Sequence, residues 1–175
     1  VRHFVGGSVA SSVHGIARAT LDVDVVAELE ARHIPVLVDA LREAYYLDEA
    51  RIREAVTMRR AFNLIHLATM FKVDVFVSRQ RPQDASAFAR ASVEAIGGDP
   101  GALRLPLASA EDIVLAKLEW FRRGGESSDR QWEDVKGLLR VGRQSIDVTY
   151  LRHWAGLIGV ADLLDRALAE ASRMP

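Results

Sequence analysis

The chain has 175 residues, with 23 lysines and arginines against 24 aspartates and glutamates, and a formal net charge of −1. This length is enough for one domain with a hydrophobic core and a helical appendage. The nearly neutral charge excludes a global basic field for nucleic acid, so any basic patch must be local. The absence of cysteine excludes disulfides, thiolate zinc sites and cysteine nucleophiles.

The composition also indicates where the protein works. No apolar run reaches the roughly 20 residues needed to span a bilayer. The segment 1–4 lacks the layout of a signal peptide. A chain without cysteine fits a reducing compartment. We therefore expect a cytoplasmic protein without a membrane partner.

The first predicted elements are a short strand and a short helix. The apolar run 3–5 reads as a strand that ends at Gly6 and Gly7. Ser8 then stands near the N-cap of a short helix predicted over 9–14.

The next predicted strand, 20–26, has a buried side and an acidic side. Successive side chains of a strand point to opposite faces. One face therefore carries Leu21, Val23 and Val25. The other face carries Asp22, Asp24 and Val26. Two carboxylates thus share one face of a single strand.

The middle of the chain predicts two helices and a β-hairpin. A proline at a first turn and the apolar spacing over 34–46 indicate an amphipathic helix, and a second short helix is expected over 48–56. The β-rich runs 62–68 and 72–77 are typical of an antiparallel hairpin. Asp74 interrupts the second, otherwise apolar run.

After residue 107 the pattern becomes helical throughout. Before it, a helix is expected over 85–92 and a strand over 103–107. Beyond it, helices are predicted over 109–121, 128–140, 149–157 and 161–172. We therefore expect an α/β core over 1–107 and a C-terminal helical region over 108–175 that packs on the core.

The three aspartates predict a site for divalent cations. Asp22 and Asp24 share a face, and Asp74 meets them if the two strands are neighbours. Like charges about 4 Å apart repel by roughly 4 kcal/mol at an effective dielectric of 20. Such a cluster needs a cation or a shared proton, and oxygen ligands without histidine or cysteine favour Mg²⁺ or Mn²⁺.

A phosphate site is predicted beside these acids. Glycine at 6 and 7 lets the backbone approach a ligand, and the helix start at Ser8 offers N–H groups to an anion. Arg18, four residues before Asp22, is a candidate for contacting the phosphates. A phosphate cradle beside a carboxylate-bound cation is the layout that phosphoryl and nucleotidyl transfer need. Each motif taken alone has a simpler explanation. A Gly-Gly-Ser run is also typical of a turn, and an Asp-x-Asp run is also typical of the solvent-exposed face of a strand.

These segments resemble a known family. Residues 5–8, followed after a short helix by 18–24, resemble the signature of the minimal nucleotidyltransferase superfamily, which is related to DNA polymerase β. More closely, the chain is similar to bacterial nucleotidyltransferase-like proteins grouped with the AbiEii toxins. Residues 72–76 match the third carboxylate of the family, and 108–118 with 129–134 are similar to its helical region.

The resemblance implies a fold and a set of roles. The fold is an α/β nucleotidyltransferase-type mixed sheet with flanking helices, followed by a C-terminal helical bundle, with a cleft between the two. Gly7 and Ser8 are expected to hold the phosphates of a nucleoside triphosphate. Asp22 and Asp24 are expected to bind two divalent cations, Mg²⁺ or Mn²⁺. Asp74 is expected to share a cation and to help deprotonate the acceptor hydroxyl.

The resemblance also assigns residues of the C-terminal region. Lys117 is expected to reach the phosphates or the base of the nucleotide. Four further residues are candidates for completing the cleft, and helix caps and interhelical salt bridges explain them equally well: Asp112, Asp129, Arg130 and Asp134.

The implied activity is metal-dependent transfer of a nucleoside monophosphate from a nucleoside triphosphate to a hydroxyl of RNA, of a protein or of a small molecule. A cognate toxin or antitoxin is an expected partner. The alternative is a catalytically weak or inactive antitoxin or regulatory binding protein with the same fold. The residues favour binding of a metal-nucleotide more firmly than its turnover.

Overall fold

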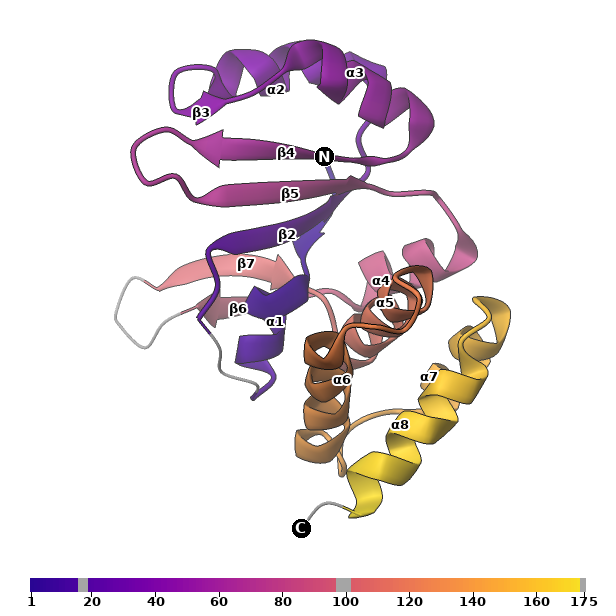
Figure 1. Ribbon diagram of the computed structural model, residues 1–175. Helices are drawn as coiled ribbons and strands as arrows, with labels where there is room; N and C mark the ends of the chain where they lie inside the picture. The colour runs from indigo at the N-terminus through magenta and orange to yellow at the C-terminus, as the bar shows by residue number, and fades with distance from the viewer. Residues whose placement is uncertain (16–18, 97–101, 174–175) are drawn as a thin grey trace. The chain divides into compact units, whose positions relative to one another are not determined.

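The structure is a computed structural model and describes residues 1–15, 19–96 and 102–173 (Figure 1). The chain forms two compact units. Unit 1 consists of Val1–Val9 and Ala19–Leu107, and unit 2 of Ala10–Arg18 and Ala108–Pro175. The elements follow in the order β1 (His3–Val5), α1 (Gly7–Val13), β2 (Asp22–Ala27), the 3₁₀ turn η1 (Ala31–His33), α2 (Ile34–Leu41), β3 (Tyr45–Tyr46), α3 (Glu49–Met58), β4 (Ala61–His66), β5 (Lys72–Val77), α4 (Pro82–Arg90), β6 (Ser92–Ile96), β7 (Leu103–Leu107), α5 (Ala110–Arg123), α6 (Asp129–Val141), α7 (Val148–Leu157) and α8 (Ala161–Arg173).

Unit 1 is built on one mixed sheet of seven strands in the order β3-β4-β5-β2-β1-β7-β6. The pair β2–β5 and the pair β1–β7 are parallel. The pairs β1–β2, β3–β4, β4–β5 and β6–β7 are antiparallel. The expected mixed sheet with flanking helices is therefore confirmed, and so is the expected hairpin, which is β4 and β5.

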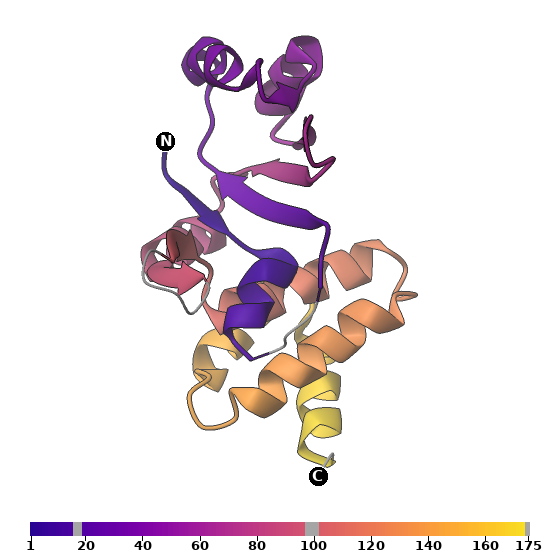
Figure 2. The same ribbon diagram turned by 90° about the vertical axis from the view of Figure 1, so that its left-hand side faces the viewer.

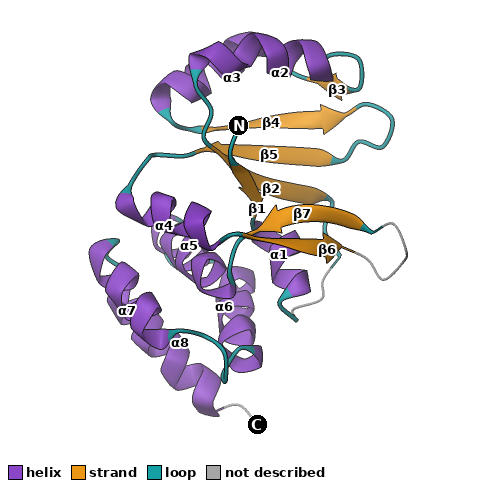
Figure 3. Cartoon of the chain, turned by 180° about the vertical axis from the view of Figure 1, so that it is seen from behind, coloured by secondary structure: helices purple, strands orange, loops and turns teal. Residues whose placement is uncertain are grey.

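One face of the sheet in unit 1 packs against α2 and α3 (Figure 3). Valine alternates along β5, and this alternation places one row of apolar side chains on a single face. The core joins the sheet residues Phe62, Leu64, Val75 and Val77 to the helix residues Ile34, Val38, Ile52, Ala55 and Val56. Burying each large apolar side chain contributes about 1.5–3 kcal/mol. The acids of β2 and β5 lie on the opposite face, away from this core.

Several boundaries differ from the sequence-based expectations. The helix expected over 34–46 ends at Leu41, because Tyr45 and Tyr46 pair with β4 instead. Leu21, expected on the buried side of a strand, precedes β2 and is 85% exposed. The sequence pattern also missed β6, whose residues are mostly exposed and lack clear alternation.

Unit 2 contains a bundle of four helices. In it α5 packs against α6 and α7, and α8 packs against the same two helices (Figure 2). Three of the helices begin at a side-chain cap, provided by Ser109, Ser128 and Asp147. Each cap accepts a hydrogen bond from a backbone N–H of the first turn, which satisfies a group that the helix leaves unpaired. Across the described ranges, no helix is both long and apolar enough to cross a membrane.

Candidate nucleotide and metal site

Parallel pairing of β2 with β5 brings the acids of the two strands together. Asp24 lies opposite Asp74, and Asp22 lies opposite Lys72, in one continuous register. Neighbouring strands are about 4.8 Å apart. Because residues two positions apart point to the same side of a strand, all four side chains share one face. This acidic face is therefore made of Asp22, Asp24 and Asp74 around Lys72.

Lys72 places a positive charge within the acidic face. Its Nζ atom lies 2.7 Å from Oδ2 of Asp74. The hydrogen bond to Asp74 raises the pKa of Lys72, and the negative charges of Asp74, Asp22 and Asp24 add to this, against the opposing effect of burial. The face thus stabilises a cation, which is the electrostatic property that a metal-nucleotide site needs.

The three carboxylates nevertheless do not form a metal-coordination site in this structure. Over residues 1–15, 19–96 and 102–173, no group of three histidine, cysteine, aspartate or glutamate side chains is arranged to hold a metal ion. Oδ1 of Asp22 instead accepts a hydrogen bond from the hydroxyl of Thr20, while Asp74 is bonded to Lys72. The donor chemistry of the adjacent Asp24 and Asp74 fits Mg²⁺ or Mn²⁺. A three-aspartate metal site therefore stays a prediction.

Gly7 brings the start of α1 against the carboxylate of Asp24. Its φ is +55°, a left-handed conformation that residues with a Cβ rarely adopt. A Cβ atom at Gly7 would overlap Oδ2 of Asp24. The backbone N–H of Gly6 donates to the carbonyl oxygen of Asp24 at 2.9 Å. Ser8 follows directly and is buried. The predicted phosphate residue Gly7 therefore packs against the predicted metal ligand Asp24, with Ser8 next to it in the chain.

Of the two basic residues predicted to contact the nucleotide, the structure describes only Lys117. Arg18 lies outside the described residues. Lys117 lies on α5 in unit 2, where its Nζ atom is 2.7 Å from Oδ2 of Asp134 on α6. The two side chains are only 12% and 10% exposed. Within its own unit Lys117 thus forms a buried interhelical salt bridge, and a contact with the nucleotide stays a prediction.

The other residues predicted to complete the cleft lie near the starts of helices in unit 2 or bond to side chains of unit 2. Asp112 accepts hydrogen bonds from the hydroxyls of Ser109 and Tyr150, at 2.6 Å and 2.7 Å. Asp129 and Arg130 lie in the first turn of α6. For Asp112, the geometry is that of a helix cap that also ties α5 to α7.

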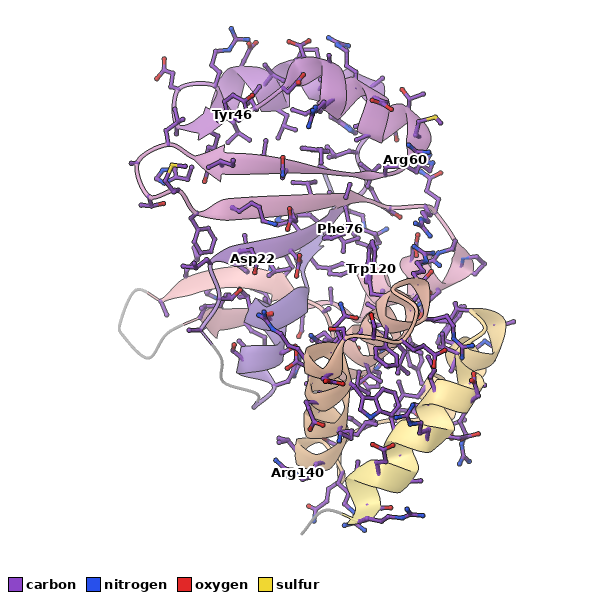
Figure 4. All side chains as sticks on the ribbon, in the orientation of Figure 1. Asp22, Tyr46, Arg60, Phe76, Trp120 and Arg140 are labelled. Atoms are coloured by element: carbon purple, nitrogen blue, oxygen red, sulfur yellow. The ribbon has the colours of Figure 1, made fainter. Side chains whose placement is uncertain are left out.

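A pocket of about 770 Å³ opens beside Asp74 in unit 1. It lies where α3 passes the edge of β4, and Asn63 on β4 is the register partner of Asp74. Figure 4 labels three of its residues: Tyr46 on β3, Arg60 just before β4 and Phe76 on β5. No sequence motif marks this pocket, so sequence reasoning missed it. Its walls come from segments that meet only in the fold.

Solved structures with the same architecture exist among proteins of very different sequence. One is the crystal structure of an antigenic nucleotidyltransferase-like protein from Paracoccidioides brasiliensis, 18% identical, with a TM-score of 0.50 over 95% of this chain and 84% of that chain. Another is the solution structure of the antibiotic-resistance factor ANT(2'')-Ia, 12% identical, with a TM-score of 0.54 over 98% and 86% of the two chains.

The chain has a nucleotidyltransferase-like fold. No protein-family profile matches its sequence. A search of curated proteins also finds no match. The grouping with the AbiEii toxins therefore stays a prediction. At identities of 18% and 12% the likeness shows the fold, and the activity has to be argued from the residues of the acidic face.

Proposed function

We propose that the acidic face of unit 1 binds a metal-nucleoside triphosphate, and that the protein transfers the nucleoside monophosphate to a hydroxyl group. The observation that carries this proposal is the placement of Asp24 beside Asp74, with Gly7 packed against the Asp24 carboxylate. Two adjacent carboxylates offer a cation site, and a bound cation would bring phosphate oxygens to it. The fold shared with nucleotidyltransferase-like proteins supports the same assignment.

Asp24 and Asp74 are the residues that would hold Mg²⁺ or Mn²⁺, with Asp22 as a third ligand once its carboxylate leaves Thr20. The bound cation would supply neutralisation of the phosphate charge. Gly7 and Ser8 would contact the phosphate oxygens.

Asp74 would take the proton of the acceptor hydroxyl. The hydroxyl oxygen then forms a bond to the α-phosphorus, while the bond from the α-phosphorus to the oxygen that bridges to the β-phosphorus breaks. Pyrophosphate leaves with that electron pair. Because Asp74 is engaged by Lys72, this role requires the ammonium group of Lys72 to move away.

The direct test is incubation of the purified protein with each α-labelled ribonucleoside triphosphate, Mg²⁺ or Mn²⁺, and total RNA, candidate acceptor proteins or small hydroxylated molecules such as L-tyrosine. We expect label transfer by the wild type and loss of at least about 100-fold in Asp24→Ala and Asp74→Ala, since both touch the reacting groups. Asp39→Ala is the matched control, because Asp39 lies on α2 and pairs with Arg42 on the surface. Equal transfer by the wild type and Asp24→Ala would overturn the proposal.

A further inference from the structure

The pocket beside Asp74 lies on a defined side of the acidic face. In the sheet order, β5 stands between β4 and β2. Asp24 and its contact with Gly7 lie on the β2 side of Asp74, and Asn63 with the pocket lies on the β4 side. Phosphates held at Gly7 would therefore lie on the other side of Asp74 from the pocket, and the two compartments meet at Asp74.

The pocket presents polar side chains that are open to a ligand. Arg51 forms an ion pair with Asp48 at 3.5 Å, and Asp74 is bonded to Lys72. Within the described part of the chain, three other lining side chains have no hydrogen bond or ion pair: the guanidinium of Arg60, the carboxylate of Glu54 and the amide of Asn63. They offer one positive group, one negative group and one neutral donor and acceptor.

The size and walls of the pocket suit a small molecule. Its volume of about 770 Å³ lies within the range of small-ligand sites. Tyr46, Phe62 and Phe76 contribute aromatic surface to the lining. Three carboxylates among the lining residues disfavour a polyanion, and two arginines disfavour a purely cationic ligand.

We propose that this pocket receives the acceptor, and that the acceptor is a small hydroxylated zwitterion. Arg60 binds its carboxylate, Glu54 binds its ammonium group, and Asn63 holds the hydroxyl next to Asp74. This inference rests on the proposed nucleotidyl transfer, because it assigns the second substrate of the same site. It makes Arg60 and Glu54 determinants of specificity.

The test uses three soluble probes that differ only in their charged groups. They are L-tyrosine, tyramine, which lacks the carboxylate, and 3-(4-hydroxyphenyl)propanoate, which lacks the amine. Amide chemical shifts of the ¹⁵N-labelled protein are followed during titration. We expect L-tyrosine to shift amides of α3 and β4 and to bind about tenfold more tightly than either analogue, because each lost charge removes a charge-assisted contact.

Two variants test which residue binds which charged group of L-tyrosine. Arg60→Gln should remove the preference for L-tyrosine over tyramine, and Glu54→Gln should remove the preference over the propanoate. Arg53→Gln is the matched control, since Arg53 lies on the same helix as Glu54, pairs with Glu49 and does not line the pocket. Both side chains under test are exposed, so neither variant threatens the core.

The outcomes separate this inference from the function on which it rests. Titration with ATP and Mg²⁺ should shift amides around Gly7 and β2 in the wild type and in both variants. If ATP binds there but the three probes bind equally, or shift no amide of α3 or β4, the zwitterion pocket is wrong and the transferase proposal stands. If neither ATP nor any of the other three ribonucleoside triphosphates shifts an amide near Gly7, the proposed function itself is wrong.

Discussion

The contact between Gly7 and Asp24 limits which residue types can occupy position 7. Because a Cβ there would overlap the Asp24 carboxylate, a side chain must displace the carboxylate or shift the start of α1. The positive φ of Gly7 adds backbone strain for any other residue. A Cβ at neighbouring Gly6 would meet none of the described atoms within 4 Å, so the two adjacent glycines have different constraints.

Gly7→Ala should therefore weaken both folding and ligand binding. We expect the free energy of unfolding to fall by about 1–3 kcal/mol from the left-handed conformation and the forced shift. Binding of ATP with Mg²⁺ should fall by at least about tenfold, since the Asp24 carboxylate is displaced. Urea denaturation and calorimetric titration measure the two effects. Gly6→Ala is the control, and equal effects of both substitutions would contradict this account.

Lys72 acts as an internal cation on the acidic face, so it should compete with a metal ion. Lys72→Met is expected to tighten binding of Mn²⁺ in the absence of nucleotide by about two- to fivefold, the range for losing a partly exposed ion pair. Electron paramagnetic resonance of free Mn²⁺ measures this affinity directly. Lys72→Arg keeps the charge and should leave the affinity near that of the wild type. Weaker Mn²⁺ binding by Lys72→Met would show that Lys72 does not compete.

At the scale of elements, the buried pair Lys117–Asp134 joins α5 to α6. Both charged groups are largely removed from water at this contact, so losing either partner is costly. A role of Lys117 in holding the helices together therefore predicts a strong effect on stability that is independent of any nucleotide.

Lys117→Met should lower the free energy of unfolding by about 3–5 kcal/mol, because it removes the ammonium group that pairs with the buried carboxylate of Asp134. The double variant Lys117→Met, Asp134→Leu should recover most of that loss, since neither buried charge of the pair remains. Thermal and urea denaturation of both proteins, without ligand, make the comparison. A single variant as stable as the wild type would argue that the salt bridge does not hold the helices.

At the scale of the whole molecule, each of the two units buries apolar side chains of its own. The core of unit 1 joins the sheet to α2 and α3, and it includes Ile52, which is 1% exposed. The core of unit 2 lies among α5 to α8 and includes Leu164, which is fully buried. Local unfolding free energies can differ between such regions of one chain.

Ile52→Ala and Leu164→Ala should each cost about 2–5 kcal/mol in the unit that carries them. We expect hydrogen exchange to accelerate in β4, β5 and α3 for the first variant, and in α5 to α8 for the second. Mass spectrometry of peptides after exchange localises the change. Uniform acceleration over both units in either variant would mean that the units unfold as one.

Local pattern and long-range pairing explain where prediction succeeded and failed. The hairpin 61–77 followed from β-branched alternation, which acts within the strand itself. The end of α2 did not follow, because Tyr45 and Tyr46 gain backbone pairing with β4, some twenty residues away. Helical spacing in the sequence cannot report a competing strand that the chain reaches later.

The alternation of Asp22 and Asp24 was readable from the sequence alone, because the face on which a strand residue lies depends only on its own backbone. Likewise, a glycine before Ser8 indicated a close approach of the backbone. Only the tertiary structure placed β5 beside β2 in the register that sets Asp24 against Asp74. It alone set Lys72 on Asp74 and opened the pocket between α3 and β4, since these contacts join segments whose distance along the chain carries no local signal.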